Sequence, residues 1–440
     1  MSAISGSVSQ SVSSSDDGLA KQRRALVGRR VVVAAVIGSG LEFYDFGVYA
    51  FFAIYIGKAF FPAVSDFTSL LLSVAIFGIG FVARPLGGLL IGAYGDRAGR
   101  KPAMMLTMFL ISIGTLGLAL TPAYDTIGLA APVLVVLWRL VQGFALGGEV
   151  GPSTSFLIEI SPPGRRGFYA SWQFASQGLA ALLAGLVGAL LARTLTPSDM
   201  QAWGWRVPFA AGLVLVGVAV YLRRRMPETL DPTEVRRISL LSGVFDDFRH
   251  HVRIVYLAVL VVLGGTVPTY VCMYMTTYAV NTLHFPPAVA MGATIAMGVS
   301  TVLFSLVGGV LADRFGGKLV MLIPRLIAVL VTYPAFVLLV DARSPSMLIC
   351  VTFVLAALTF VSNAAALSSI PQLLPAGFRS TGLSLAYALG VTIFGGSTQF
   401  VVTWLILVTG SPFAPAWYLV ATGSISALAV VALPSARAQT

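Results

Sequence analysis

Apolar stretches of roughly the 20 residues that a helix needs to cross a lipid bilayer recur along this chain. Hydrophobic residues make up 57 % of the sequence and charged residues only 10 %, against roughly 25 % charged in soluble domains. The stretches lack the period-two alternation of a barrel strand, so membrane-spanning helices are predicted. Twelve can be counted, near residues 31–57, 68–95, 103–121, 128–159, 168–192, 204–222, 254–280, 288–312, 318–340, 346–373, 380–408 and 414–433.

The basic residues indicate how these spans are oriented. Of the 28 Lys and Arg residues, 21 fall on the side of the N-terminal tail, and the opposite loops carry three, Lys58, Arg193 and Arg343. Positive charge marks the cytoplasmic side, so both termini are predicted to be cytoplasmic. The net charge of +11 is thereby explained as a topology signal, and nucleic-acid binding is not needed to account for it.

An internal repeat divides the chain into two halves. The segment Gly92-x-x-x-Asp96-Arg97-x-Gly99-Arg100-Lys101 recurs 217 residues later as Gly309-x-x-x-Asp313-Arg314-x-Gly316-Gly317-Lys318. A duplicated six-helix unit with a site between the copies is a transporter architecture. The predicted organisation is a disordered cytoplasmic tail (1–30), an N-terminal half (31–222), a cytoplasmic linker (223–253), a C-terminal half (254–433) and a short cytoplasmic tail (434–440).

At these residues the chain resembles the major facilitator superfamily, and more narrowly its metabolite:proton symporters. The loop from Gly92 to Lys101 is similar to the superfamily signature, and Arg139-x-x-x-Gly143-x-x-x-Gly147 to its helix-4 motif. Further similar stretches are 41–46 (LEFYDF), 84–88 (RPLGG), 142–149 (QGFALGGE), 166–171 (RGFYAS) and 203–209 (WGWRVPF). The resemblance implies an all-α membrane protein with twelve transmembrane helices in two pseudo-symmetric six-helix halves, the major facilitator fold. The citrate and tricarballylate branch is most similar, followed by the α-ketoglutarate branch.

Several charged residues fall well inside predicted spans, where a charge needs a partner or a wet cavity. They are Glu42, Asp45, Arg84, Arg139, Glu149 and Arg325. Glu42 and Asp45 are three positions apart, so they share a helix face, and their mutual repulsion favours protonation of one. We therefore predict proton coupling through Glu42, Asp45, Arg139 and Glu149, the alternative being that the acids only pair with Arg84 or Arg139.

Substrate binding is predicted at polar side chains within the spans. The Arg84 guanidinium can hold a carboxylate through two parallel hydrogen bonds. Polar stripes with a spacing of four residues run through two helices, Tyr169, Gln173 and Gln177 in one and Thr266, Tyr270, Tyr274 and Tyr278 in the other. Hydrogen bonding between helices is the alternative explanation of each stripe. The predicted substrate-binding set is Arg84, Tyr44, Gln173, Gln177, Tyr270, Tyr274, Asn363 and Tyr387.

Charged residues at the cytoplasmic edge form a third group. The resemblance implies that they latch the helices in the outward-open state, whereas plain surface salt bridges would contribute little. Gly317 replaces the cation that Arg100 supplies in the first copy, so a weaker latch is expected in the second half. The predicted gating residues are Asp96, Arg97, Gly99, Arg100, Glu159, Arg166, Asp313 and Arg314.

The predicted function is proton-coupled import of citrate or a related tricarboxylate by alternating access. An α-ketoglutarate or dicarboxylate symporter is the alternative, followed by a betaine or proline symporter and a non-transporting sensor on the same fold. Osmolyte relatives can carry a long coiled-coil C-terminal extension, which is not expected here. No enzyme, cofactor or metal site is predicted, since two cysteines and three histidines show no ligand spacing. The partners expected are a small organic anion, protons and the lipid of a bacterial inner membrane, with a functional monomer and no obligate protein partner.

Overall fold

The computed structural model describes residues 36, 40, 43–45, 47–62, 65–98, 100–149, 153–154, 157, 161–162, 164–224, 242–373 and 386–434. The side chains at 89, 92, 93, 95–98, 100, 215, 219, 222, 223, 242–251, 371 and 372 lie outside that description. Within the described part, ten helices are long and apolar enough to cross a membrane. Two further helical stretches, 43–45 with 47–60 and 204–218, overlap the predicted first and sixth spans.

The N-terminal half is built from helices that follow the predicted apolar segments. They are α2 (Ala53–Phe60), α3 (Asp66–Val82), α4 (Arg84–Ala98), α5 (Arg100–Leu120), α6 (Tyr124–Ile127), α7 (Ala130–Gly147), α9 (Arg166–Thr194), α10 (Pro197–Ala202), η1 (Gly204–Arg206) and α11 (Val207–Arg224). α3 and α4 continue one another through Ala83, and together they form the predicted second span.

The C-terminal half is likewise helical throughout its described part. Its elements are α12 (Ser242–Asn281), α13 (Pro287–Phe315), α14 (Gly317–Ala342), α15 (Pro345–Ser369), η3 (Ile370–Leu373), the π-helical η4 (Val391–Gly395), α17 (Gly396–Thr409) and α18 (Ala414–Ala432). α12 begins at Ser242, so helix extends into the stretch 223–253.

Hydroxyl side chains fix where several helices begin. The side chains of Ser65, Thr196 and Ser344 accept hydrogen bonds from backbone N–H groups of the first turns of α3, α10 and α15. Such caps satisfy N–H groups that have no partner inside the helix. The sequence therefore marks the outer ends of these helices locally, while the apolar runs set their length.

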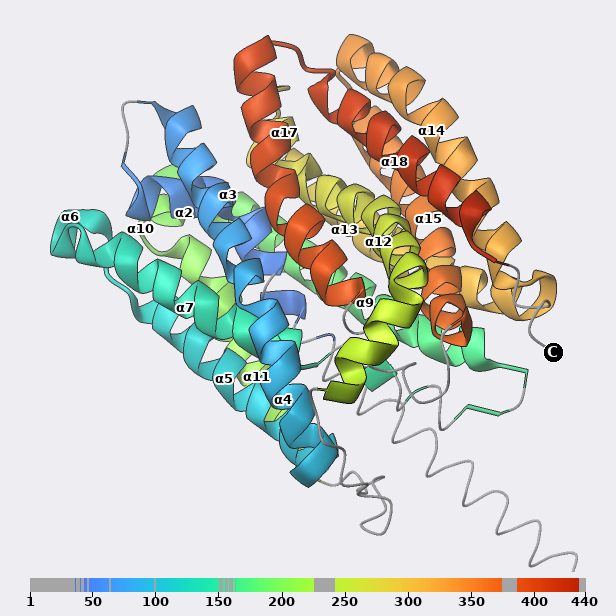
Figure 1. Ribbon diagram of the computed structural model, residues 1–440. Coiled ribbons are helices and arrows are strands. Elements are labelled where there is room, and N and C mark those ends of the chain that lie inside the picture. Colours follow the sequence, from blue (N-terminus) through green and yellow to red (C-terminus); the bar gives the residue numbers. More distant parts are fainter. Residues whose placement is uncertain are drawn as a thin grey trace, which may run out of the picture.

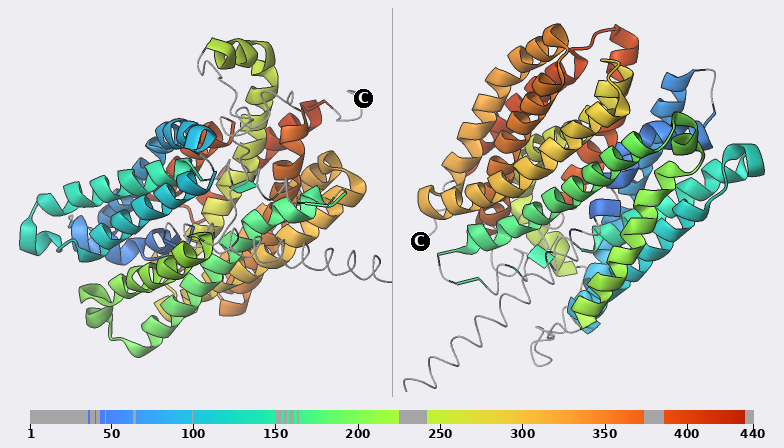
Figure 2. Two further views of the ribbon diagram at one scale, coloured as in Figure 1. Left: turned by 90° about the horizontal axis from the view of Figure 1, so that it is seen from below. Right: turned by 180° about the vertical axis from the view of Figure 1, so that it is seen from behind.

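The two halves lie side by side as separate helix bundles (Figure 1). α9 and α13 run alongside each other between them, as the back view in Figure 2 shows. Their contact relies on glycine: a Cβ at Gly178 would lie 2.7 Å from the Val302 nitrogen, and one at Gly167 would lie 2.6 Å from the Gly309 carbonyl oxygen. Bare helix surfaces of this kind let transmembrane backbones approach closely.

Glycine also packs helices within the N-terminal half. A Cβ at Gly143 of α7 would overlap the carbonyl group of Gly80, and one at Gly147 would overlap that of Arg84. Gly143 and Gly147 therefore have a packing role between these helices. This contact holds α3 and α4 against α7, and it fixes where Arg84 and Arg139 lie relative to each other.

The two copies of the repeated loop make matching contacts. Lys101, at the start of α5, donates to the carbonyl oxygen of Arg224 at the end of α11, 2.7 Å away. Lys318, at the start of α14, donates to the carbonyl oxygens of Val431 and Leu433 at the end of α18, at 2.9 and 2.6 Å. A lysine at a helix C-terminus satisfies orphan carbonyls and offsets the helix dipole. Both halves thus close their third and sixth spans with the same residue of the repeat.

Candidate functional site

A cavity of about 570 Å³ lies between the two halves. Phe43, Phe174 and Gln177 of the N-terminal half line one side, and the other side is formed mainly by α12 and α15. Aromatic and aliphatic walls with a few polar groups are typical of small-molecule sites.

Four of the eight residues predicted to bind substrate line this cavity. They are Gln177, Tyr270, Asn363 and Tyr387. The Asn363 amide also donates to the carbonyl oxygen of Gly265 at 3.3 Å, which fixes its position against α12. Gly265 is bare because a Cβ there would overlap the Asn363 side chain.

Tyr44, Gln173 and Tyr274, which are also predicted to bind substrate, do not line this cavity. The Tyr44 hydroxyl donates to the carbonyl oxygen of Pro208 at 3.1 Å, and Gln173 accepts from Ser153 at 3.3 Å. The Tyr274 hydroxyl accepts from Thr403 of α17 at 2.8 Å. For these three, the alternative of hydrogen bonding between neighbouring segments describes the observed contacts.

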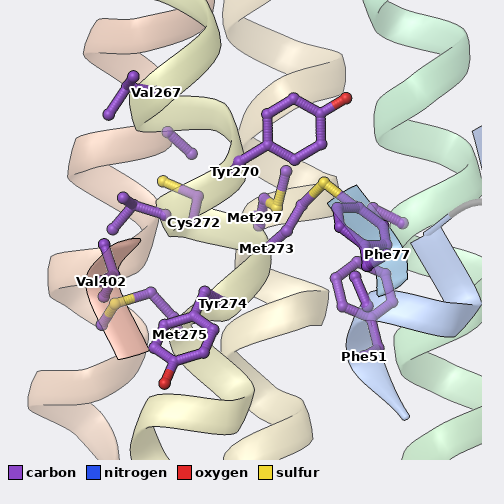
Figure 3. Close-up of a cluster of buried hydrophobic side chains, with 14 of the residues drawn as sticks. Phe51, Phe77, Val267, Tyr270, Cys272, Met273, Tyr274, Met275, Met297 and Val402 are labelled. Atoms are coloured by element: carbon purple, nitrogen blue, oxygen red, sulfur yellow. The ribbon is translucent and has the colours of Figure 1, made fainter. Parts of the chain in front are cut away.

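The two tyrosines of α12 differ because a helix turns by about 100° per residue. A step of four residues therefore overshoots a full turn by roughly 40°, and a stripe drifts around the helix. Figure 3 shows Tyr270 and Tyr274 one turn apart on α12, with Phe51 and Phe77 of the N-terminal half on the other side of the cluster. Tyr270 packs against the Phe77 and Phe81 rings, with centroids 6.0 and 5.3 Å apart.

Arg84 contacts Tyr270, one of the residues that line the cavity. Its guanidinium lies over the Phe81 ring, 3.9 Å from the centroid, and it interacts with the Tyr270 hydroxyl. The side chain is 7 % exposed. The buried Arg84 guanidinium does not itself line the cavity in this structure, whereas Tyr270, which it contacts, does.

Asp45 and Arg139 are joined through one glutamine. Gln142 donates to the Asp45 carboxylate at 2.5 Å and accepts from the Arg139 guanidinium at 2.7 Å. Arg139 also lies 4.5 Å from the centre of the Tyr49 ring and 5.2 Å from that of Phe77. This chain links an acid of the first span to a cation of α7, and Gln142 is a member that the sequence did not single out as a site residue.

The remaining acids of the predicted proton-coupling set are placed differently. Glu149 is buried, accepts from the Thr107 hydroxyl at 3.1 Å and lies at the contact between α5 and the end of α7. Glu42 lies outside the residues that the structure describes.

One predicted gating residue joins the two halves at the edge where α13 ends and α9 begins. The two carboxylate oxygens of Asp313, near the end of α13, accept from the backbone N–H groups of Gly167 and Phe168 at 2.7 and 2.9 Å. Arg166 begins α9, and both Arg166 and Arg314 are exposed. The side chains of Asp96, Arg97 and Arg100, and residues Gly99 and Glu159, lie outside the described part of the chain.

Comparison with known proteins identifies the family behind this architecture. The model of the Major Facilitator Superfamily matches residues 35–397. The chain belongs to the major facilitator superfamily. It is therefore a multi-pass membrane transporter and not an enzyme, as predicted from the resemblance.

Curated relatives of this major facilitator protein include anion and osmolyte carriers. It is 36 % identical to a citrate-proton symporter of Klebsiella pneumoniae, over 92 % of this chain and 94 % of that protein. It is also 36 % identical to an alpha-ketoglutarate permease of Escherichia coli, over 88 % of this chain and 89 % of the relative. A proline/betaine transporter of Escherichia coli is 30 % identical, over 92 % of this chain and 83 % of that one.

Solved structures confirm the major facilitator fold. A crystal structure of a D-xylose-proton symporter matches with a TM-score of 0.72 and 20 % identity, covering 93 % of this chain and 99 % of that one. A partially occluded inward-open xylose transporter from E. coli matches with a TM-score of 0.74 and 18 % identity, covering 94 % and 99 %. At this identity the likeness concerns the fold alone.

Arg325 is the charged residue that lines the cavity, and the predicted substrate-binding set does not contain it. It was recognised as an intramembrane charge, but nothing in its own helix indicates that it reaches the cavity that it helps to line. A signal does exist on a different helix. Gly264 and Gly265 leave the facing surface of α12 bare, and a Cβ at Gly264 would lie 3.1 Å from an Arg325 guanidinium nitrogen.

Proposed function

We propose that this transporter is a proton-coupled symporter that imports citrate or a related tricarboxylate by alternating access. The observation that carries the proposal is a cavity between the halves that is lined by Arg325 and bordered by Arg84, in a chain 36 % identical to a citrate-proton symporter. Guanidinium groups hold carboxylates through paired, charge-assisted hydrogen bonds. A site with this charge selects an anion.

Proton coupling follows from the electrical work of uptake. Moving one elementary charge across 100 mV requires about 2.3 kcal/mol. Moving a trianion into a negative interior therefore requires roughly 7 kcal/mol of electrical work. Protons that enter with the substrate offset this work. Asp45, Gln142 and Arg139 are joined by buried hydrogen bonds. Protonation of the Asp45 carboxylate would therefore change the electrostatic interaction between Asp45 and Arg139.

A dicarboxylate such as α-ketoglutarate is the second candidate. It is favoured by the equal identity to the alpha-ketoglutarate permease. A betaine or proline substrate is disfavoured by the buried cation that lines the cavity, because the positively charged ammonium group of either molecule would be repelled there.

Alternating access needs two packings of the halves and residues that clamp one of them. In our proposal Asp313 and the first copy of the repeat hold the cytoplasmic side closed, and Gly78, Gly167 and Gly178 supply the close contacts of that packing. We place the protein in a bacterial inner membrane with both termini in the cytoplasm. It acts as a monomer, without cofactor or obligate protein partner.

Calorimetric binding to the detergent-purified chain tests the substrate class. Citrate, tricarballylate, α-ketoglutarate and glycine betaine are compared at one pH and ionic strength. Saturable binding of the tricarboxylates, with no heat from betaine, is expected. Betaine binding in the absence of carboxylate binding would contradict the proposal.

A further inference from the structure

Arg325 places a guanidinium inside the C-terminal half. It is 4 % exposed and lines both the cavity between the halves and a second cavity of about 450 Å³ within its own half. Its Nε donates to the Ser362 hydroxyl at 2.8 Å, and its Nη1 donates to the Ser426 hydroxyl. The Nη2 atom is buried, with no hydrogen-bond partner among the described residues.

The C-terminal half supplies no carboxylate for this cation. Between residues 254 and 433 the sequence contains only two acids, Asp313 and Asp341. Asp313 is exposed and binds the start of α9. Asp341 is exposed at the far end of α14, sixteen positions or about 24 Å from Arg325 along the helix.

The N-terminal half differs because its buried cation, Arg139, has a carboxylate nearby. Arg139 is connected to the Asp45 carboxylate through Gln142, so a negative charge lies two hydrogen bonds away. Among the described residues, the hydrogen bonds of Arg325 go to the hydroxyl groups of Ser362 and Ser426. A buried charge compensated by dipoles alone is costly at membrane depth, and an anion that enters the cavity would relieve that cost.

The facing helix leaves space for this cation. A Cβ at Gly264 would contact Arg325 and Ser426, and one at Gly265 would overlap Asn363. The paired glycines of α12 therefore let the guanidinium and the Asn363 amide share one wall of the cavity. An amide beside a guanidinium can donate further hydrogen bonds to a carboxylate.

We propose that Arg325 is the carboxylate-binding residue of the C-terminal half and selects substrates with more than one carboxylate. This inference rests on the proposed function, in which Arg84 binds a carboxylate from the N-terminal half. The substrate then connects the halves through two cations, one on each side of the cavity. A monocarboxylate can satisfy only one of them.

Calorimetry of citrate binding to Arg325→Gln tests the assignment. The citrate dissociation constant is expected to rise at least about thirtyfold, since truncating one partner of a desolvated charged hydrogen bond has that effect or more. Glutamine has an amide nitrogen at the position of the arginine Nε, so the variant can keep the hydrogen bond to Ser362. Gel filtration tests whether the variant is folded. A folded Arg325→Gln protein that binds citrate within threefold of the parent overturns the inference.

Two companion variants keep the test decisive. Arg325→Lys retains the charge and loses the two-pronged geometry, so a loss of about tenfold is expected even if the glutamine variant does not fold. Unchanged citrate affinity in a folded Arg325→Lys protein also overturns the inference. Arg206→Gln is the matched control, because Arg206 binds the backbone carbonyls of Ala119, Thr121 and Ala202 away from the cavity.

Binding to the parent protein distinguishes failure of the proposed function from failure of the Arg325 assignment. If it binds neither tricarboxylates nor α-ketoglutarate, the proposed function fails and takes this inference with it. If it binds them and the Arg325 variants bind equally well, only the inference fails.

Discussion

The Asp313 carboxylate of α13 accepts a hydrogen bond from the backbone nitrogen of Gly167, the second residue of α9, and thereby joins the two halves of the transporter. Its other oxygen accepts from Phe168, so one acid caps the N-terminus of a 29-residue helix. A negative charge at this end of a helix also interacts favourably with the helix dipole. The contact exists only while the start of α9 and the end of α13 lie together.

Asp313→Asn should shift the transporter toward cytoplasm-open states. It removes the charge and one of the two acceptors, which weakens the contact by about 1–2 kcal/mol, or roughly five- to thirtyfold in population. Turnover should fall while substrate affinity changes only a few-fold, because Asp313 does not line the cavity. Asp341→Asn is the control, since it neutralises the other acid of this half at the far end of α14.

Alkylation of a cavity cysteine measures that shift. Ala366→Cys lies in the cavity wall, and Cys350 is replaced by Ser because it is exposed. An impermeant maleimide added to inverted vesicles should label the Asp313→Asn protein faster than its parent. Equal labelling rates, or a large loss of affinity at unchanged turnover, would show that Asp313 does not control gating.

Arg84 is predicted to be a carboxylate ligand. Arg84→Lys should bind citrate clearly more weakly than the parent, and Arg84→Ala should lose at least about thirtyfold in affinity. The competing explanation is that Arg84 only neutralises an acid of the first span. Calorimetry on the double variant Arg84→Ala with Asp45→Asn separates these explanations, because near-normal citrate binding there would exclude the ligand role.

Proton coupling is predicted to depend on an acid of the first span. Asp45→Asn and Glu42→Gln are each assayed for uphill uptake and for substrate exchange. Loss of accumulation with retained exchange is expected for at least one, since exchange does not require net proton movement. If both variants still accumulate substrate, the coupling carboxylate lies elsewhere, and Glu149, buried against Thr107, is the next to test.

Glycine packing makes a prediction about stability. Gly143→Ala forces a methyl group into the Gly80 carbonyl, and overpacking of this kind destabilises by about 1–3 kcal/mol. Gly217→Ala on α11 is the matched control, because its Cβ would meet nothing within 4 Å. The thermal midpoint in detergent should fall for the first variant only. Equal midpoints would mean that the contact between α3 and α7 adjusts freely.

The fold was largely predictable because the membrane imposes it. Each apolar run must form a helix, and the repeated loop divides the helices between two halves. The matching contacts of Lys101 and Lys318 follow from that repeat.

The site was only partly predictable, because side chains on one stripe diverge in space. Tyr270 lines the cavity while Tyr274, one turn away, binds Thr403. Arg325 was the harder case, since its access to the cavity depends on two glycines of another helix, Gly264 and Gly265. No periodicity within α14 carries that information.

Uptake into proteoliposomes under an imposed pH gradient tests directly whether the protein is a proton-coupled citrate symporter. Labelled citrate, α-ketoglutarate and glycine betaine are offered to vesicles whose exterior is more acidic than the lumen. Citrate should accumulate above its external concentration, and betaine should not be taken up. An ionophore that collapses the proton gradient should abolish the accumulation of citrate. Accumulation of betaine alone, or citrate accumulation that survives the ionophore, would contradict the proposed function.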